Sequence, residues 1–223
     1  LKNGKIHLSC ELFPPKQGAE LQNSLEIVNK IAASKPSYMS VTYGAGGSTV
    51  GYSAALAKKV EDNGMPALAH LTCVKADEAK LAEVLGQLQG FGVKNILALR
   101  GDIPADMQGE EIGSFAYASE LMRFVKQQGD FCVGGAAYPE GHPESGSLEQ
   151  DIENTKYKVD AGVDFLVTQM FFDNTILYNY MFRLLRAGIN VPVVPGIMPV
   201  TNAKQIIRIC QLSGTKLPPQ FRA

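Results

Sequence analysis

The sequence predicts an α/β fold of the (β/α)8 TIM-barrel class, and three observations support that prediction. Short apolar runs alternate with amphipathic segments of helical spacing along the whole chain, as in βα units around a parallel sheet. No linker or composition break divides them, so we expect residues 1–223 to form one catalytic domain. At least six apolar runs end on a polar residue just before a loop, and a barrel gathers such strand ends around the mouth where its chemistry occurs.

Seven βα units are expected in chain order. The first pairs a strand at 7–13 with a helix at 18–34, in which Leu21, Leu25 and Val28 recur at helical spacing. The other strands are expected at 38–43, 67–72, 95–99, 131–138, 164–170 and 191–195, and the other helices at 49–63, 77–90, 115–128, 148–161, 175–187 and 202–213. Helix starts are expected as a capping box at Ser147 and Gln150, and as N-caps at Asn174 and Thr201.

Seven units are one fewer than a closed barrel needs, and the tail 213–223 has no room for another strand and helix. An open sheet would leave the first and seventh strands with exposed ladder groups, so we expect the eighth unit to be absent from a C-terminally incomplete chain. A doubly wound open sheet remains the alternative, because strand order cannot be read from a sequence. It would also place the strand ends at a ligand crevice.

Composition and charge favour small-molecule partners. The 223 residues are 45% hydrophobic and 19% charged with a net charge of −1, and no Lys/Arg cluster marks a surface for nucleic acid or anionic membrane. The four cysteines are widely spaced and have no metal-ligand pattern, so we expect reduced thiols, no metal and a cytoplasmic protein. No apolar run is long enough to span a membrane.

Glu11 is the first candidate for chemistry. It lies in an apolar run that Pro14 and Pro15 end, so few waters should surround it and its pKa should rise. A carboxyl group with a raised pKa is a usable general acid near neutral pH. The alternative is an ion pair with a Lys or Arg on a neighbouring strand.

Two loops could bind anions or polar rings. Arg100, Gly101 and Asp102 place a fixed cation, a permissive backbone and a carboxylate at one strand end, and a salt bridge between Arg100 and Asp102 is the alternative. The glycine-rich loop 44–48 could cradle an anion at a helix N-terminus, or serve only as a tight βα turn.

Later strand ends and one helix supply further candidates. His70 and His142 could contact a ligand or be structural. Gln169 is an amide in a very apolar stretch and could hydrogen-bond a heterocycle at two points. Asp151, Asn154 and Lys158 share one helix face by their spacing, for which a solvated surface is the default expectation.

Taken together, these segments resemble the methylenetetrahydrofolate reductases, a flavin-dependent barrel family of one-carbon metabolism. The resemblance covers essentially the whole chain and has seven motifs in the family's order. They are Glu11-Leu-Phe-Pro-Pro15, Ser40-Val-Thr-Tyr-Gly-Ala-Gly-Gly-Ser48, Ala69-His-Leu-Thr-Cys73, Leu99-Arg-Gly-Asp102, Ala137-Tyr-Pro-Glu-Gly-His142, Thr168-Gln-Met-Phe-Phe-Asp173 and Pro195-Gly-Ile-Met-Pro199.

The resemblance implies non-covalent FAD, reduced by NADH or NADPH and reoxidised by 5,10-methylenetetrahydrofolate in a ping-pong cycle that supplies methionine synthesis. It assigns FAD contacts to Thr42, His70, Leu99, Arg100, Gly101, Asp102, Tyr117, Ala118, Tyr138, His142, Asp151, Asn154 and Lys158. Glu11 matches the general acid, Asp102 the carboxylate close to flavin and pterin, and Gln169 the folate-binding amide. A homo-oligomer is also expected.

Two departures from the family pattern concern folate binding. The family's folate site also uses a C-terminal segment that this sequence lacks, and Ile209 stands where bacterial relatives place an aromatic residue. Other possibilities are a flavin-dependent barrel of the proline dehydrogenase kind, a folate-binding methyltransferase barrel and a catalytically silent binding module. Sequence leaves the choice between NADH and NADPH open.

Overall fold

The computed structural model describes residues 4–43, 50–74, 76–102 and 113–221. It divides into two compact units, Leu1–Gly134 and Gly135–Ala223, and each is considered by itself below. Strands alternate with helices throughout, and the strand order is β1-β2-β3-β4-β5-β6-β7. The pairings β1–β2, β2–β3, β3–β4 and β6–β7 are parallel, which confirms the predicted α/β barrel class.

The elements lie close to the predicted ranges but are mostly shorter. The strands are β1 (Ser9–Leu12), β2 (Tyr38–Val41), β3 (Ala67–Thr72), β4 (Asn95–Leu99), β5 (Cys132–Ala137), β6 (Phe165–Thr168) and β7 (Val193–Val194). The α-helices are α1 (Leu21–Ala32), α2 (Val50–Asp62), α3 (Glu78–Gly90), α4 (Ala118–Gln128), α5 (Leu148–Asp160), α6 (Asn174–Arg186) and α7 (Ala203–Ser213), and single 3-10 turns are η1 (Gly18–Glu20) and η4 (Pro219–Phe221).

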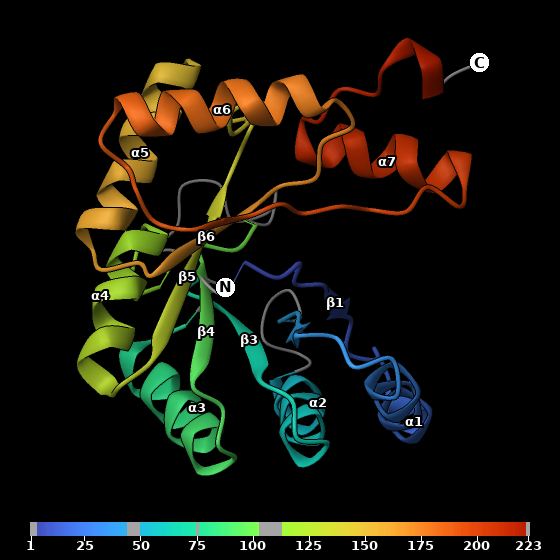
Figure 1. The fold of residues 1–223 in the computed structure, drawn as a ribbon. Helices are drawn as coiled ribbons and strands as arrows, with labels where there is room; N and C mark the ends of the chain where they lie inside the picture. Colours follow the sequence, from blue (N-terminus) through green and yellow to red (C-terminus); the bar gives the residue numbers. More distant parts are fainter. Residues whose placement is uncertain (1–3, 44–49, 75, 103–112, 222–223) are drawn as a thin grey trace. The chain divides into compact units, whose positions relative to one another are not determined.

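The strands of the first unit have one apolar and one partly polar face. Met39, Leu71 and Ile96 point to one side and are fully buried. Helices α1, α2 and α3 lie next to one another in this unit, where α2 packs on β2 and β3 (Figure 1). Because side chains alternate along a strand, the residues between those apolar ones share the opposite face. Glu11 and His70 project from that opposite face.

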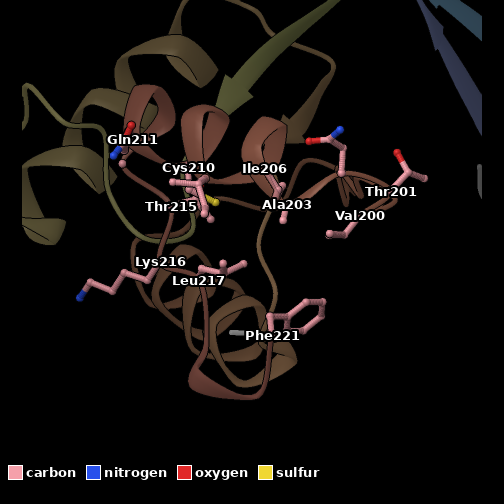
Figure 2. Close-up of a pocket in the computed structure, with 13 residues that line it drawn as sticks. Val200, Thr201, Ala203, Ile206, Cys210, Gln211, Thr215, Lys216, Leu217 and Phe221 are labelled. Carbon is pink, nitrogen blue, oxygen red and sulfur yellow. The ribbon is translucent and has the colours of Figure 1, made fainter. Parts of the chain in front are cut away.

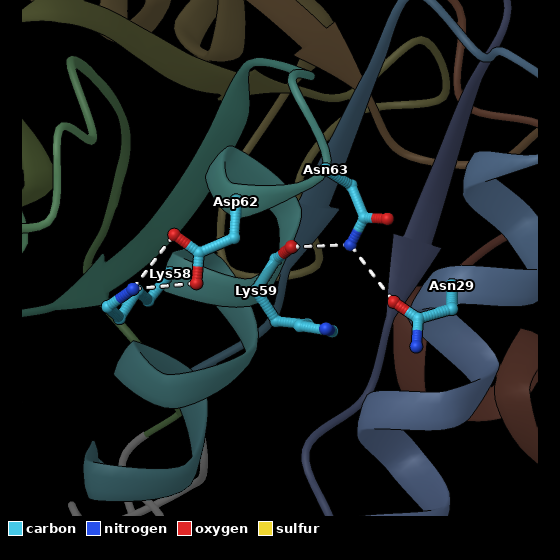
Figure 3. A network of polar contacts seen from close by, with 5 residues as sticks. All are labelled: Asn29, Lys58, Lys59, Asp62 and Asn63. Carbon is cyan, nitrogen blue, oxygen red and sulfur yellow. Dashed lines mark hydrogen bonds and ion pairs between the residues drawn. The ribbon is translucent and has the colours of Figure 1, made fainter.

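Asn63 links the end of α2 to α1. Its side-chain amide donates to the Lys59 carbonyl at 2.8 Å and to Asn29 Oδ1 at 3.1 Å (Figure 3). Gly64 follows with φ +76°, the left-handed conformation that commonly ends helices. In the last turn of α2, Lys58 and Asp62 form a surface ion pair at 2.6 Å.

Asn63→Ala should lower the free energy of unfolding by about 1 kcal/mol, because the end of α2 loses a carbonyl partner and its bond to α1. Lys58→Ala is the matched control on the same helical turn. Its exposed pair is worth no more than about 0.5 kcal/mol. Urea unfolding of both variants checks the ranking, and an equal loss in the two would contradict it.

Three predicted helix starts need correction. Ser147 does accept a hydrogen bond from the Gln150 backbone, but the Gln150 side chain donates to Glu153 and Asn154 instead of closing a capping box. The N-caps of α6 and α7 are Asp173 and Asn202, one residue away from the predicted Asn174 and Thr201. Each has extended backbone and a side-chain oxygen that accepts from the first turn.

The second unit has its own apolar cluster of Met170, Ile206 and Cys210. Phe172, Met198, Ile209 and Leu217 pack against it, so α7 is fixed to the chain that follows β6. None of the four cysteines forms a disulfide bond, and Cys73 and Cys210 are buried whereas Cys10 and Cys132 are partly exposed. Within the described residues, no helix is long and apolar enough to cross a membrane.

Candidate active site

Glu11, Ser40 and His70 come together in the first unit. Glu11 on β1 pairs in register with Ser40 on β2, and His70 follows on β3. Glu11 Oε2 lies 3.7 Å from His70 Nε2. The Ser40 and His70 side chains are buried, whereas the Glu11 side chain is 48% exposed. The Glu11 carboxyl group therefore reaches solvent next to two buried polar side chains, a position from which it can contact a ligand.

Burial shifts the pKa of both ionisable groups toward the neutral form. Desolvation raises the pKa of Glu11, and a hydrogen bond with the Ser40 side chain partly offsets that rise. Desolvation lowers the pKa of His70 to about 4. The predicted rise for Glu11 is confirmed. In the described part of the chain, the ionisable side chain that lies against the Glu11 carboxyl group is His70, which carries no charge near pH 7 because its pKa is lowered to about 4.

His70 should make the folded protein sensitive to acid. Its pKa falls from 6.5 to about 4 on folding, so below pH 6.5 the unfolded chain binds the proton more readily. Stability is then lost as the pH falls from 6.5 toward 4, by about 2–3 kcal/mol at pH 4.5. Urea unfolding at pH 7 and pH 4.5 should show this loss in the wild type and not in His70→Gln.

The comparison of variants is needed because the raised pKa of Glu11 acts in the opposite direction. Folded Glu11 takes up its proton at a higher pH than the unfolded chain does, so acidification stabilises the fold through this group. His7→Gln, which removes a histidine bonded to Ser37 in the same unit, serves as the control. An acid loss of the same size in His70→Gln and in the wild type would contradict the assignment.

The predicted strand-end residues of β2 and β4 also lie in this unit. Thr42 directly follows β2, and its backbone donates to Leu12 at 2.9 Å. Leu99 ends β4, and Gly101 has φ +89°, where a Cβ would come within 3.1 Å of Thr72 Cβ. Only glycine fits such a turn without strain. Arg100 is half-buried and Asp102 is exposed.

Residues near α4 are placed at a helix start. Tyr117 is the N-cap residue of α4 and is 64% exposed, and Ala118 is the first helical residue. The Glu120 carboxylate accepts from the backbone of Ala116 at 2.8 Å and of Tyr117 at 3.2 Å, which fixes the entry to the helix. The glycine-rich loop 44–48 lies outside the described residues.

A second polar cluster surrounds Asp151 at the start of α5, in the second unit. Its side chain is 3% exposed. Oδ1 accepts hydrogen bonds from the His142 backbone at 3.3 Å and from the Ser145 hydroxyl at 3.2 Å. Oδ2 is buried with no hydrogen-bond partner. An unpartnered buried carboxylate oxygen is costly in a folded protein, and marks an acceptor available to a ligand.

Lys158 lies on the same helix and is also withdrawn from water. Its ammonium group donates to the Ala136 carbonyl at 2.7 Å and lies 5.6 Å from the centre of the Tyr138 ring. The pKa of Lys158 is lowered by desolvation, which Asp151 partly counteracts. The Tyr138 ring in turn meets the His142 ring edge-on at 4.6 Å. The default expectation of a solvated face is therefore wrong for Asp151 and Lys158.

Gln169 directly follows β6. Its backbone donates to Ala137 at 2.7 Å, and its side-chain oxygen accepts from the Met170 backbone at 2.9 Å. This local bond holds the amide in place and uses one lone pair of the oxygen, so two-point bonding to a ligand remains chemically open. Nearby, Gly196 donates to the Thr168 hydroxyl at 2.9 Å, and a Cβ at 196 would overlap the Thr168 carbonyl.

A pocket of about 930 Å³ lies beside α7 in the second unit. Its wall comes from α7 and the chain on either side of it, and Leu217 lies between the adjacent Cys210 and Thr215 and the more distant Phe221 (Figure 2). None of the predicted site residues lines it. Within the described residues, no group of three or more His, Cys, Asp or Glu side chains could hold a metal ion.

The sequence singled out neither Ser40 nor Tyr180. Ser40 left a signal, because it alternates with Thr42 in an apolar strand, which puts two polar side chains on one face. Tyr180 on α6 is 1% exposed, and burial raises the pKa of its hydroxyl to about 12, with Asp151 adding to the rise. Nothing in the sequence around Tyr180 indicates that its hydroxyl lies near Asp151.

Comparison with known proteins gives consistent matches. A family model described as methylenetetrahydrofolate reductase matches residues 1–223. The 5,10-methylenetetrahydrofolate reductase of Escherichia coli strain K12 is 36% identical over 216 residues, covering 96% of this chain and 72% of that protein. Methylenetetrahydrofolate reductase (NADH) 1 of Arabidopsis thaliana is 34% identical over 236 residues, covering 100% of this chain and 40% of that protein.

A solved structure shares the fold at low sequence identity. It is an uncharacterized protein from Clostridium thermocellum described as binding two copies of 5-methyl-5,6,7,8-tetrahydrofolic acid. Its TM-score is 0.67 with 14% identity, and the match covers 98% of this chain and 75% of that one. At that identity the likeness supports the fold alone.

Proposed function

The chain belongs to the methylenetetrahydrofolate reductase family, and we propose that it reduces 5,10-methylenetetrahydrofolate to 5-methyltetrahydrofolate. The reductant is NADH or NADPH, used in a ping-pong cycle through bound FAD. The supporting observation is Glu11, a carboxyl group with a raised pKa on the polar face of the strands. We also propose a cytoplasmic homo-oligomer that supplies methyl groups for methionine synthesis.

The described residues fit FAD at Asp151. Its Oδ2 is buried and lacks a hydrogen-bond partner, and the family resemblance assigns the residue to the cofactor. A polar ligand would satisfy this atom and remove the cost of leaving it unpaired. The residues proposed to hold FAD are Thr42, His70, Leu99, Arg100, Gly101, Asp102, Tyr117, Ala118, Tyr138, His142, Asp151, Asn154 and Lys158. FAD, when bound, accepts a hydride from the nicotinamide and passes it to the folate.

Glu11 supplies the proton in this proposal. Opening the bridged ring of the substrate needs a proton on the departing nitrogen, and desolvation raises the pKa of Glu11, which favours the protonated form that can donate it. Asp102 is proposed to stabilise the cationic iminium that ring opening produces. Gln169 is proposed to bind the folate ring through its amide.

An anaerobic experiment tests the proposal in two steps. The purified protein should take up FAD and show its visible absorbance. That absorbance should bleach on addition of NADH or NADPH and return on addition of 5,10-methylenetetrahydrofolate. A colourless protein that takes up no FAD would refute the assignment. Bleaching with no return would instead favour a flavin-dependent barrel with another substrate, such as an amino acid.

A further inference from the structure

Ser40 and Glu11 face each other across neighbouring strands. The register pairs Glu11 with Ser40, and Ser40 with Leu68 on β3. His70 lies two residues beyond Leu68, so its side chain projects from the same face. Three polar side chains from neighbouring strands therefore lie close together on the partly polar face of the sheet. Ser40 is 6% exposed and His70 8% exposed, so the two lie beneath the more exposed Glu11.

Both buried groups can donate to the Glu11 carboxyl group. Ser40 pairs in register with Glu11, and its hydroxyl is close enough to lower the pKa of the carboxyl group in part. His70 Nε2 lies 3.7 Å from Oε2, just beyond hydrogen-bonding distance, and has no other partner among the described residues. The Glu11 side chain is 48% exposed, so a small rotation of its carboxyl group toward His70 would meet little packing and would close that gap. His70 stays neutral at physiological pH, so it offers Glu11 a donor without a full positive charge.

We propose that Ser40 and neutral His70 are positioning residues for Glu11, each donating a hydrogen bond to its carboxyl group and thereby directing the acidic proton toward the substrate. This inference rests on the proposed function, in which Glu11 is the proton donor. When both donors bind the carbonyl oxygen of the protonated carboxyl group, the O–H on the other oxygen is left to point at the ligand. After the proton moves from Glu11 to the substrate nitrogen, the same two donors stabilise the resulting carboxylate.

The arrangement explains why these donors are neutral. A cation beside Glu11 would favour its ionised form strongly and lower the pKa. A hydroxyl and a neutral imidazole lower it only in part, so burial still keeps the carboxyl a usable acid. The titratable side chain on this face of β2 is Tyr38, which pairs with Ser9, two residues before Glu11. His70 is therefore the titratable group that faces the carboxylate from β3.

Carbon-13 NMR of the full chain labelled at glutamate carboxyls tests the proposal without substrate. The Glu11 signal is identified by its loss in Glu11→Gln. Ser40→Ala should raise the titration midpoint of Glu11 by about half to one pH unit, because the carboxylate loses a donor. Ser40→Thr retains the hydroxyl and should restore the midpoint. Ser53→Ala removes an equally buried hydroxyl that bonds the Thr42 carbonyl, and should leave the midpoint unchanged.

Nitrogen-15 NMR of the wild-type histidines supplies the second measurement. Neutral His70 should carry its proton on Nε2, the nitrogen that faces Glu11. A proton on Nδ1 instead, or an unchanged Glu11 midpoint in Ser40→Ala, would overturn the proposal. The wild-type histidine measurement decides the question even if Ser40→Ala fails to fold. If both NMR results hold while Glu11→Gln retains folate turnover, the contacts stand and the proposed acid role falls.

Discussion

Glu11→Gln should slow the oxidation of reduced flavin by 5,10-methylenetetrahydrofolate by about 10²–10⁴-fold, the usual contribution of a general acid. Glutamine keeps the shape of the side chain and removes the proton that the departing nitrogen needs. Reduction of the flavin by NADH or NADPH needs no such proton and should stay within a few-fold of the wild type. Stopped-flow absorbance of each half-reaction, measured anaerobically, separates the two effects.

The pH dependence gives an independent check on Glu11. Since desolvation raises the pKa of the carboxyl group, the wild-type folate half-reaction should slow as the pH rises through that pKa and the proton is lost. Glu11→Gln should lack this descent. Glu26→Gln, which changes an exposed carboxylate on α1, is the control for charge and should behave as the wild type. Equal loss of both half-reactions in Glu11→Gln would refute the role of general acid.

The strands with the clearest boundaries were predicted best. The ranges 67–72 and 95–99 match β3 and β4, because Pro66 or a short turn precedes each apolar run. The last strand was predicted at 191–195, and only Val193–Val194 is found. Its ladder is set by pairing with Leu166 and Val167 on β6. Cross-strand pairing of this kind is absent from a one-dimensional pattern, so strand length is harder to predict than strand existence.

The same limit applies to the candidate site. Glu11 and His70 could each be picked out from an apolar run, but their approach to 3.7 Å depends on the register of three strands. The alternation of Ser40 with Thr42 indicates only that the two share a strand face, and the partner of Ser40 is known only from the register with Glu11. Asp151 and Lys158 were correctly placed on one face of a helix. Spacing does not reveal which face the protein covers, so their burial came only from the structure.

Asp151→Ala should lower the free energy of unfolding by about 3 kcal/mol, the largest stability effect expected from a polar site in this chain. The substitution leaves the His142 backbone N–H and the Ser145 hydroxyl without their acceptor. It also removes the charge that partly offsets the desolvation of Lys158. Glu149→Gln, on the same helix, removes the charge of a fully exposed carboxylate that pairs with Arg183, and should leave the free energy of unfolding close to that of the wild type. Urea unfolding of the two variants should therefore differ clearly.

Asp151→Asn separates the structural role of this residue from its role toward FAD. The amide oxygen can accept the two bonds that Oδ1 now accepts, so stability without cofactor should fall by only about 1 kcal/mol. The amide NH₂, however, replaces Oδ2, the buried acceptor that has no partner in the protein. At a given concentration, a ligand stabilises the fold more when it binds more tightly. Added FAD should therefore raise the urea midpoint of unfolding more in the wild type than in Asp151→Asn. An equal rise in both would show that Oδ2 does not face the cofactor, and its burial would then be a purely structural cost.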